Sequence, residues 1–356
     1  MPGIKNNDPT DKKNGRASGL LKPVYIIPVF VLLLLMGYFY TRAFHTVDTF
    51  TYTHMTMDTM AELRFQARGV REAEEIRDEV FTEIERLEEL FSRSIPESDV
   101  VAVNENAGRK PVQVSPEVFY VTERAIEYAE LSEGAFDPTV APLTDLWGFF
   151  SDQDYRVPEP EEIEETLQLV DYSLVELDPE EKTIYLPVSG MGLELGGIAK
   201  GFIVDQALEI LSGAGVENAF VNAGDIGLLG TRPDGEPWRI GVRNPRDERD
   251  MIAVLALIDK AVDTSGDYER YFEEDGVKYH HILDAQTGMP AMDLASVTVV
   301  ADTTIEADVL STLAFIIGPD EGLELIEGLA GVEGIFVTPG LELTYTDGLE
   351  DIIELE

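Results

Sequence analysis

Apolar residues recur along the chain with two periods, one typical of amphipathic helices and one of short strands. Between Ala67 and Phe91 they stand four, four, three and four residues apart, which predicts a helix. Further helices are predicted after Ser115-Pro116 and over Ile198–Leu211, Thr304–Ile317 and Gly322–Leu329. Short apolar runs predict strands at residues 218–221, 238–242, 253–258, 261–263 and 295–301. Short strands mixed with helices, without regular βαβ alternation, predict an α+β fold.

One segment near the N-terminus is apolar enough to enter a membrane. Residues 24–40 carry no charge, and residues 1–23 before them hold five basic and two acidic side chains. A basic flank before an apolar run is typical of an export signal. We therefore expect a cytoplasmic tail (1–23), a single-pass transmembrane signal anchor (24–40), a polar stalk (41–55) and a folded domain (56–356) outside the cell membrane. A cleaved signal peptide is the alternative interpretation.

Composition excludes several classes of protein. The chain has 356 residues, 44% of them hydrophobic, so it can bury a proper core. It has no cysteine, which excludes disulfides, zinc–thiolate sites and cysteine nucleophiles. With 26 basic and 69 acidic residues its net charge is −43, which argues against a nucleic-acid partner. So acidic a surface fits a protein that works in concentrated salt.

Two glycine-containing segments suggest ligand-binding loops. Residues 134–142 (GAFDPTVAP) form a rigid loop after a helix, or a plain helix-to-strand turn. Residues 193–201 (LELGGIAKG) place glycines and Lys200 at the start of a helix, where backbone and helix dipole favour a phosphate. Tight packing of a strand on a helix explains the same glycines. Residues 151–167 are acidic, contain two prolines and are interpreted as a surface excursion.

Two other segments carry candidate acid–base and metal-binding groups. His281 and Asp284 stand in the run HILDAQTGMP (281–290), where an imidazole is suited to proton transfer, although a histidine is often structural. Asp308 and Thr312 lie one helical turn apart and share a face, so they can offer two oxygens to Mg²⁺. Alternatively, Thr312 bonds its own backbone and Asp308 faces solvent.

Together these segments resemble the ApbE family of FAD:protein FMN transferases. The resemblance extends from about Thr56 to Thr338, and its most specific parts are residues 134–149, 195–201, 264–272, 281–290 and 306–312. It implies an α+β fold with a mixed or antiparallel sheet and packed helices. It also implies an exported, membrane-attached enzyme with FAD as substrate and Mg²⁺ as cofactor. FMN passes to a Ser or Thr hydroxyl of a flavin-carrying membrane redox subunit, and AMP leaves.

The resemblance also assigns residues to roles. It implies metal ligands at Asp308, Thr312 and the backbone carbonyl of Gly197. His281 is the implied base, and Asp284 beside it would orient the imidazole. The implied flavin and nucleotide contacts are Met57, Ser94, Ala135, Phe136, Asp137, Glu194, Lys200 and Ile282. The chain contains no convincing D-x-x-[ST]-G-A-T acceptor, so it is not expected to flavinylate itself.

Departures from the family pattern leave two other functions open. Ser94 stands where the family usually places an aromatic ring against the flavin, and Glu194 stands where it usually has aspartate. A serine stacks on nothing, which leaves the isoalloxazine less shielded from water. A Mg²⁺-dependent FAD pyrophosphatase that gives FMN and AMP is therefore one alternative. A membrane-tethered flavin-binding protein without turnover is the other.

Overall fold

The computed structural model describes residues 28, 30–34, 36, 47–57, 59–150 and 155–355. These fall into two units, residues 1–47 and 48–356. In the first unit residues 30–34 are helical, but the predicted tail (1–23) and most of the predicted anchor (24–40) lie outside the described residues. Within the part of the chain that the structure describes, no helix has the length and apolar character needed to span a membrane.

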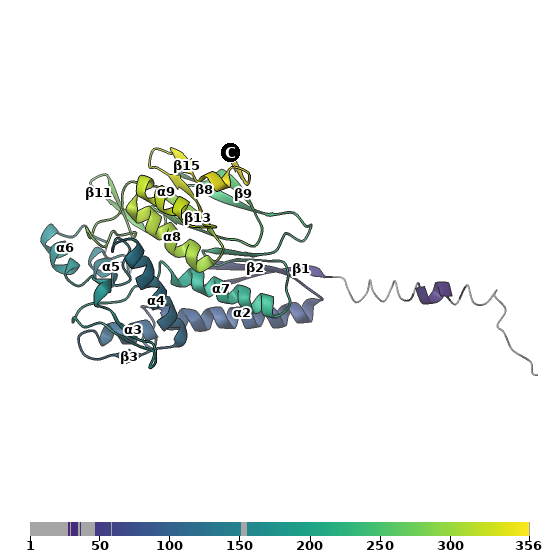
Figure 1. Ribbon diagram of the computed structural model, residues 1–356, viewed down its shortest axis with the longest axis horizontal. Coiled ribbons are helices and arrows are strands. Elements are labelled where there is room, and N and C mark those ends of the chain that lie inside the picture. Colours follow the sequence, from purple (N-terminus) through teal and green to yellow (C-terminus); the bar gives the residue numbers. More distant parts are fainter. Residues whose placement is uncertain are drawn as a thin grey trace, which may run out of the picture. The chain divides into compact units, whose positions relative to one another are not determined.

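An eight-stranded antiparallel sheet forms the centre of the second unit (Figure 1). In spatial order its strands are β1 (Asp48–Thr56), β2 (Thr59–Ala67), β6 (Ala219–Asn222), β7 (Ile226–Leu229), β10 (Ala261–Gly266), β13 (Ser296–Ala301), β14 (Glu333–Val337) and β15 (Leu343–Tyr345). A three-stranded sheet contains β16 (Ile353–Leu355), β9 (Asp247–Leu257) and β8 (Trp238–Asn244). The smaller sheets pair β11 (Tyr271–Glu274) with β12 (Val277–His280), and β3 (Val112–Gln113) with β5 (Thr183–Tyr185) and β4 (Glu176–Asp178).

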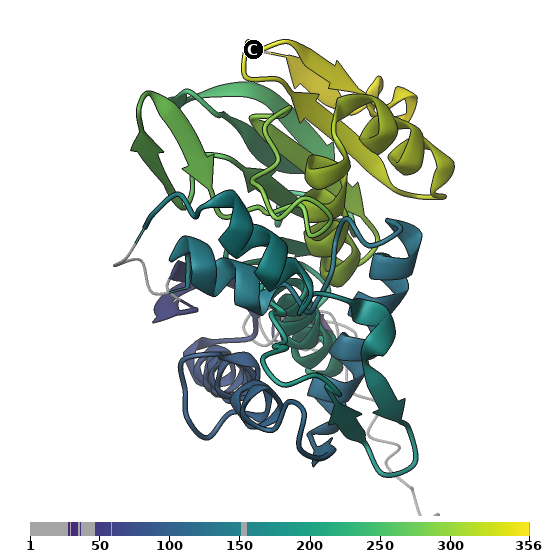
Figure 2. The ribbon, with the colours of Figure 1, turned by 90° about the vertical axis from the view of Figure 1, so that its left-hand side faces the viewer.

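The helices are placed mainly by their apolar faces. They are α2 (Val70–Phe91), α3 (Asp99–Glu105), α4 (Pro116–Leu131), α5 (Ala141–Trp147), α6 (Pro160–Leu167), α7 (Ala199–Gly213), α8 (Thr304–Ile317) and α9 (Pro319–Gly328), with 3₁₀ turns at Tyr172–Leu174 and Asp347–Leu349. Helices α2 and α7 lie side by side, and Figure 2 views them nearly end-on. Helix α8 contacts α7 as well as β10 and β13, so it joins the helical layer to the large sheet.

The large sheet is covered on both faces. On one face Val221, Val297 and Val299 belong to the main core, with apolar residues of α2, α7 and α8. On the other face Val262, Val300, Ile335 and Val337 pack with Trp238, Leu255 and Leu257 of the three-stranded sheet. The expectation of an α+β fold with antiparallel sheets and packed helices is confirmed.

Three local expectations are corrected. Residues 48–55, expected in a polar stalk, form most of β1, whose Phe50, Tyr52 and His54 turn inward while the alternating threonines are exposed. The helix predicted from Ala67 begins at Val70, because Ala67 ends β2 and Gly69 breaks the chain direction at φ 140°. The excursion at 151–167 contains the short helix α6, which buries Ile163.

Candidate functional site

The candidate site lies where α7 and α8 cross. Gly201, in the first turn of α7, leaves no room for a side chain, since a Cβ there would stand 2.4 Å from the Thr304 carbonyl oxygen. The backbone N–H of Gly201 donates to Oδ2 of Asp308 on α8 at 2.9 Å. The glycine therefore allows the close approach, and the carboxylate satisfies an N–H that the helix start leaves unpaired.

Three buried carboxylates meet beside this crossing. Asp308 comes from α8, Asp263 from β10 and Asp225 from the turn between β6 and β7, and one oxygen of each lies within 4.8 Å of the others. All three residues are 6% exposed or less. Ser311, one turn along α8, donates its hydroxyl to Oδ2 of Asp263 at 2.5 Å. Strand and helix thus present their polar residues to the same enclosed volume.

Burial makes these carboxylates hold their protons more tightly. It raises the pKa of Asp225 to about 7, and the negative charge of Asp308 adds to the effect. It raises the pKa of Asp263 to about 8, with repulsion from Asp225, and the pKa of Asp308 to about 6. Near neutral pH the cluster therefore holds protons that a bound cation would release.

Lys200 supplies the positive charge of the cluster. Its Nζ lies 2.5 Å from Oδ1 of Asp225 and 3.7 Å from Oδ1 of Asp308, and 39% of its side-chain surface is exposed. Burial of the ammonium opposes its charge, but attraction by Asp225, Asp308 and Asp263 outweighs this and raises the pKa of Lys200. Lys200 is a permanent cation in this site, at the positive end of the α7 dipole.

The side chains present fit a hard cation such as Mg²⁺. One oxygen of Asp225, Oδ2, is buried without a hydrogen-bond partner, which is costly unless a cation or proton satisfies it. A Cβ on Gly197 would lie 3.5 Å from Oγ1 of Thr312, so two of the three predicted ligands are neighbours. Asp308, the third, is one turn from Thr312 on α8. Oxygen donors of this kind are those that Mg²⁺ prefers.

The predicted flavin contacts in the 134–142 loop have different surroundings. The Phe136 ring lies 3.5 Å from the Cβ position of Gly197, beside the predicted metal ligands. The Asp137 carboxylate, by contrast, accepts the Thr139 N–H and hydroxyl and the Tyr172 N–H inside the protein. The Ala135 carbonyl accepts the N–H of Ala285. Asp137 therefore shapes the 134–142 loop, and Phe136 is the residue of this loop that lies beside Gly197.

Three other predicted contacts stand on three different segments. Met57 sits in the β1–β2 turn with φ 49°, its N–H held by Glu88 at 2.9 Å. Ile282 is buried in the main core. Ser94 is exposed, its hydroxyl 3.0 Å from that of Ser92. Ser94 thus offers a small hydroxyl and no ring at the protein surface.

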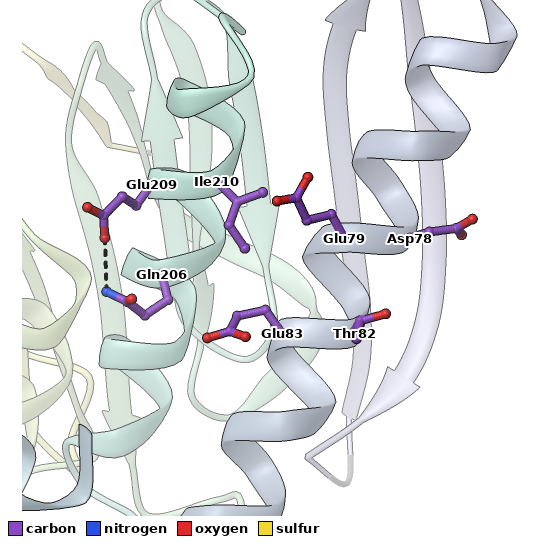
Figure 3. A pocket seen from close by; sticks show the side chains of 7 residues that line it. All are labelled: Asp78, Glu79, Thr82, Glu83, Gln206, Glu209 and Ile210. Carbon is purple, nitrogen blue, oxygen red and sulfur yellow. Dashed lines mark hydrogen bonds between the residues drawn. The ribbon is translucent and has the colours of Figure 1, made fainter. Parts of the chain in front are cut away.

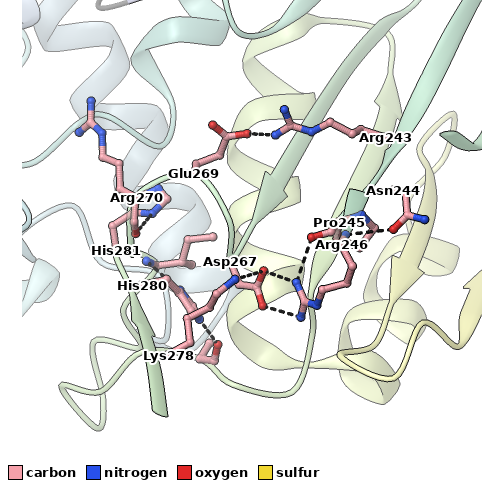
Figure 4. A network of polar contacts seen from close by, with 12 residues as sticks. Arg243, Asn244, Pro245, Arg246, Asp267, Glu269, Arg270, Lys278, His280 and His281 are labelled. Carbon is pink, nitrogen blue, oxygen red and sulfur yellow. Dashed lines mark hydrogen bonds and ion pairs between the residues drawn. The ribbon is translucent and has the colours of Figure 1, made fainter. Parts of the chain in front are cut away.

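The two adjacent histidines have different roles (Figure 4). His280 is buried, its Nε2 donates to the Ala291 carbonyl at 2.6 Å, and its Nδ1 accepts the Ile282 N–H. His281 is partly exposed, and its Nδ1 lies 3.3 Å from the Arg270 carbonyl. Because a carbonyl only accepts, Nδ1 carries the hydrogen and Nε2 keeps its lone pair. Burial lowers the pKa of His281 to about 3, helped by neighbouring His280 and Arg270, so the ring is neutral but is a weaker base than an ordinary imidazole.

Asp284 does not orient this imidazole, contrary to expectation. Its carboxylate accepts the Gln286 N–H and the Thr287 hydroxyl, each at 2.8 Å, and its backbone closes the turn with Gly288. The Arg270 carbonyl takes the orienting role instead. Asp284 is a turn-forming residue, because an aspartate that bonds its own backbone two residues on stabilises such turns.

Two hollows among the described residues lie elsewhere. One, of about 610 Å³, lies between the facing surfaces of α2 and α7, and its lining includes Asp78, Glu79, Glu83 and Glu209 (Figure 3). Four carboxylates would repel a pyrophosphate, so this hollow is unsuited to a nucleotide. The other, of about 580 Å³, is lined by His280 and by Asp267, whose carboxylate pairs with Arg246 and Lys278 (Figure 4).

Sequence reasoning missed Asp225, Asp263 and Ser311 as members of the cluster. A charged residue inside an apolar strand was the available signal for Asp263, and an aspartate directly after a short apolar run was the signal for Asp225. It also missed Arg93, which bonds to Glu194 at 2.8 Å.

The large antiparallel sheet thus carries an oxygen-rich cluster beside the N-terminus of α7. Residues 57–336 match the model of the ApbE family, and the chain belongs to that family. It is 32% identical over 326 residues to the FAD:protein FMN transferase of Treponema pallidum (strain Nichols), covering 87% of this chain and 90% of that protein. With the FAD:protein FMN transferase of Klebsiella pneumoniae (strain 342) it shares 36% over 275 residues, covering 76% and 84%.

Solved structures give the same result. The ApbE protein of Thermotoga maritima superposes with a TM-score of 0.80 at 34% identity, covering 86% of this chain and 99% of that one. The flavinyl transferase ApbE of Pseudomonas stutzeri, in its apo form, gives 0.76 at 30%, covering 86% and 97%. Both structures cover 86% of this chain, so the chain is an ApbE-family enzyme by both sequence and fold.

Proposed function

We propose that this protein transfers FMN from FAD to a Ser or Thr hydroxyl of a client flavoprotein, with Mg²⁺ as cofactor and AMP as product. The observation that carries the proposal is the cluster in which Asp308 and Thr312 of α8 meet Lys200 and Gly197 at the start of α7. The names of its relatives, FAD:protein FMN transferases, support the reaction class.

The residues divide into binding and proton-transfer groups. Asp308, Thr312 and the Gly197 carbonyl would hold Mg²⁺, with Asp225 and Asp263 beside them. When bound, Mg²⁺ neutralises charge on the pyrophosphate of FAD. Lys200 and the positive end of α7 favour the same phosphates, which a chain of net charge −43 would otherwise repel.

His281 is the proposed general base. In the transfer step the client hydroxyl oxygen forms a bond to the FMN phosphorus, while the bond from that phosphorus to the AMP oxygen breaks. AMP leaves with the bonding electron pair, and Nε2 of His281 accepts the hydroxyl proton. The hydrogen bond from Nδ1 to the Arg270 carbonyl holds the tautomer that this step requires.

We further propose that the enzyme works outside the cell membrane, held by residues 24–40, on flavin-carrying membrane redox subunits. The charge-free run and its basic flank support this location. A second function, FAD hydrolysis to FMN and AMP, is favoured by one observation: Ser94 is exposed and offers no ring to shield a flavin from water.

One assay separates these functions. The full-length protein is incubated with FAD and Mg²⁺, together with an acceptor domain that carries a D-x-x-S-G-A-T threonine or its Thr→Val variant. AMP and a fluorescent band for the threonine domain alone are the expected result. AMP and FMN without a band would indicate the hydrolase. FAD binding without AMP would leave a flavin-binding protein and refute both reactions.

A further inference from the structure

Arg93 joins three segments of the chain that surround the candidate site. We propose that Arg93 is a positioning residue for FAD. Arg93 acts through Glu194, which restrains the Gly196–Gly197 turn. The inference rests on the proposed function for the identity of the ligand. The contact network itself does not depend on the ligand.

The guanidinium of Arg93 is almost enclosed, with 10% of the side-chain surface exposed. One nitrogen donates to Glu194 Oε2 at 2.8 Å and to the Thr144 hydroxyl at 2.9 Å. The other donates to both oxygens of Asp145, at 2.8 and 2.9 Å. The ring of Phe150 covers the guanidinium, with its centroid 4.3 Å from the central carbon. Only a planar, multidentate cation can serve all these partners together.

Glu194 connects Arg93 to the Gly196–Gly197 turn. Its second carboxylate oxygen, Oε1, accepts the Gly196 N–H at 3.0 Å. Its own N–H donates to the Pro138 carbonyl at 2.8 Å, which ties the turn to the 134–142 loop. Gly197, the next residue, lies against Thr312 and Phe136. A single chain of contacts therefore runs from Arg93 to the predicted metal and flavin positions.

Opposite charges hold these contacts together. Burial opposes the charge of Arg93, but attraction by Glu194 and Asp145 outweighs it and raises the pKa of the guanidinium. Without Arg93, the Glu194 carboxylate would lose its cationic partner and keep only the glycine N–H. A partly enclosed carboxylate without a partner turns toward water, and the Gly196–Gly197 turn would lose its anchor.

Loss of Arg93 should affect binding more than chemistry. The turn it restrains would hold the phosphates and cofactor of FAD, whereas His281 stands on a separate segment after β12 and is oriented by Arg270. Hence Kd and KM for FAD should rise while kcat at saturating FAD changes little, a separation that partial unfolding does not produce.

The test compares Arg93→Met with Arg93→Lys and with Arg86→Met in the full-length protein. Arg86 is the matched control, since it also pairs with two carboxylates, Glu83 and Glu117, but lies on the exposed side of α2. Arg93→Met is expected to raise Kd and KM for FAD about tenfold or more, with kcat within about threefold. Arg93→Lys restores part of the affinity, and Arg86→Met leaves all three values unchanged.

A second measurement needs no ligand. In the FAD-free protein, hydrogen exchange at residues 193–197 should be faster in Arg93→Met than in the wild type, and unchanged in Arg86→Met. The double variant Arg93→Met/Glu194→Gln should bind FAD no worse than Arg93→Met alone. Unchanged exchange together with an FAD affinity within about twofold of wild type would overturn the inference. Wild-type protein that binds FAD without transfer would overturn the proposed function alone.

Discussion

Asp308 and Asp205 cap each other's helices. Asp308 on α8 accepts the N–H of Gly201 in α7 at 2.9 Å, and Asp205 on α7 accepts the N–H groups of Thr304 and Ile305 in α8 at 2.7 and 3.0 Å. Each carboxylate satisfies donors that its partner helix cannot pair internally. This exchange fixes the two helices relative to each other, and so fixes Lys200 beside Asp308.

Asp308 caps α7 and Thr312 caps no helix. Variants at these two positions can therefore separate an effect on stability from an effect on binding. Asp308→Ala removes a cap and a predicted ligand, so it should destabilise the metal-free protein by about 1–2 kcal/mol and also weaken Mg²⁺ and FAD binding. Thr312→Val keeps the shape and should weaken Mg²⁺ and FAD binding alone. Urea unfolding of chelated protein and Mg²⁺ titration measure the two effects, and Thr312→Ser serves as the rescue control. Unchanged Mg²⁺ affinity in Thr312→Val would remove Thr312 from the ligand set.

Lys200 should be important for stability as well as for binding. Lys200→Met leaves the three carboxylates without their cation. We expect the free energy of unfolding to fall by about 3 kcal/mol near pH 8. This is the lower end of the range for a broken buried ion pair, because the Lys200 side chain is 39% exposed. The loss should shrink near pH 5, where the carboxyl groups are protonated. Lys260→Met is the control, since Lys260 pairs with the exposed Asp302. Equal losses for the two variants in urea unfolding would contradict the expectation.

The raised pKa values predict a pH dependence for the metal-free protein. Between about pH 6.5 and 8 folded Asp225 and Asp263, with pKa values about 7 and about 8, hold protons that the unfolded chain has lost. Stability is therefore present at the lower pH and is lost as the pH rises through these values. The lowered pKa values of His280 and His281 act only below this window, where unfolded imidazoles gain protons.

Denaturant midpoints of chelated protein across this window measure the effect. Asp263→Asn, which cannot titrate, should flatten the slope. Mg²⁺ should stabilise the protein more at the upper end than at the lower end, because it competes with protons for the same oxygens. A midpoint that stays level or rises with pH in the chelated wild type would contradict proton binding by the cluster in this window.

His281→Ala should separate transfer from binding. We expect the transfer rate to fall by about 10²–10⁴, with Kd for FAD unchanged, because the base acts only when the hydroxyl attacks. Single-turnover flavinylation of an acceptor domain and a separate FAD titration check the two quantities. His54→Ala on β1 is the control histidine variant, paired in the wild type with Glu85. Full transfer activity in His281→Ala would exclude His281 as the base.

The surface charge predicts stabilisation by salt. Raising KCl from about 0.1 M to 2 M shortens the screening length from about 10 Å to below 3 Å, which weakens repulsion among the excess carboxylates. The melting temperature should rise, and rise further than in sucrose of equal osmolality, which is excluded from protein surfaces without screening charge. A melting temperature that stays flat or falls would contradict adaptation to salt.

Local patterns predicted the long helices well, but they missed several strands and the short helices. Helix α8 has the predicted bounds Thr304–Ile317, because its cap at Thr303 and its long apolar run act within one element. Strand β1 was missed because its composition is polar. The signal was the strict alternation of threonine with Phe50, Tyr52 and His54, which is typical of a half-buried edge strand. Helix α6 was missed although Pro160 and the Glu159–Glu162 capping box mark its start.

The site could be predicted only as far as its members are neighbours in sequence. Asp308 and Thr312 share a helical face by periodicity alone. Asp225 and Asp263 meet because β7 pairs antiparallel with β10, a topology that no local pattern reports. The orienting role predicted for Asp284 was wrong for the converse reason, since its carboxylate accepts a backbone N–H close by.

Helix α8 carries two of the three predicted metal ligands in an enclosed part of the fold. Ten of its fourteen residues are buried, between the large sheet and α7. Segments so enclosed open only when the whole unit unfolds, whereas binding sites on loops often melt first. Catalytic competence in this protein is therefore tied to the global folding equilibrium. Activity should disappear over the same denaturant range as the tertiary structure, and a mutation that merely destabilises the core would change the amount of active enzyme but not its turnover number.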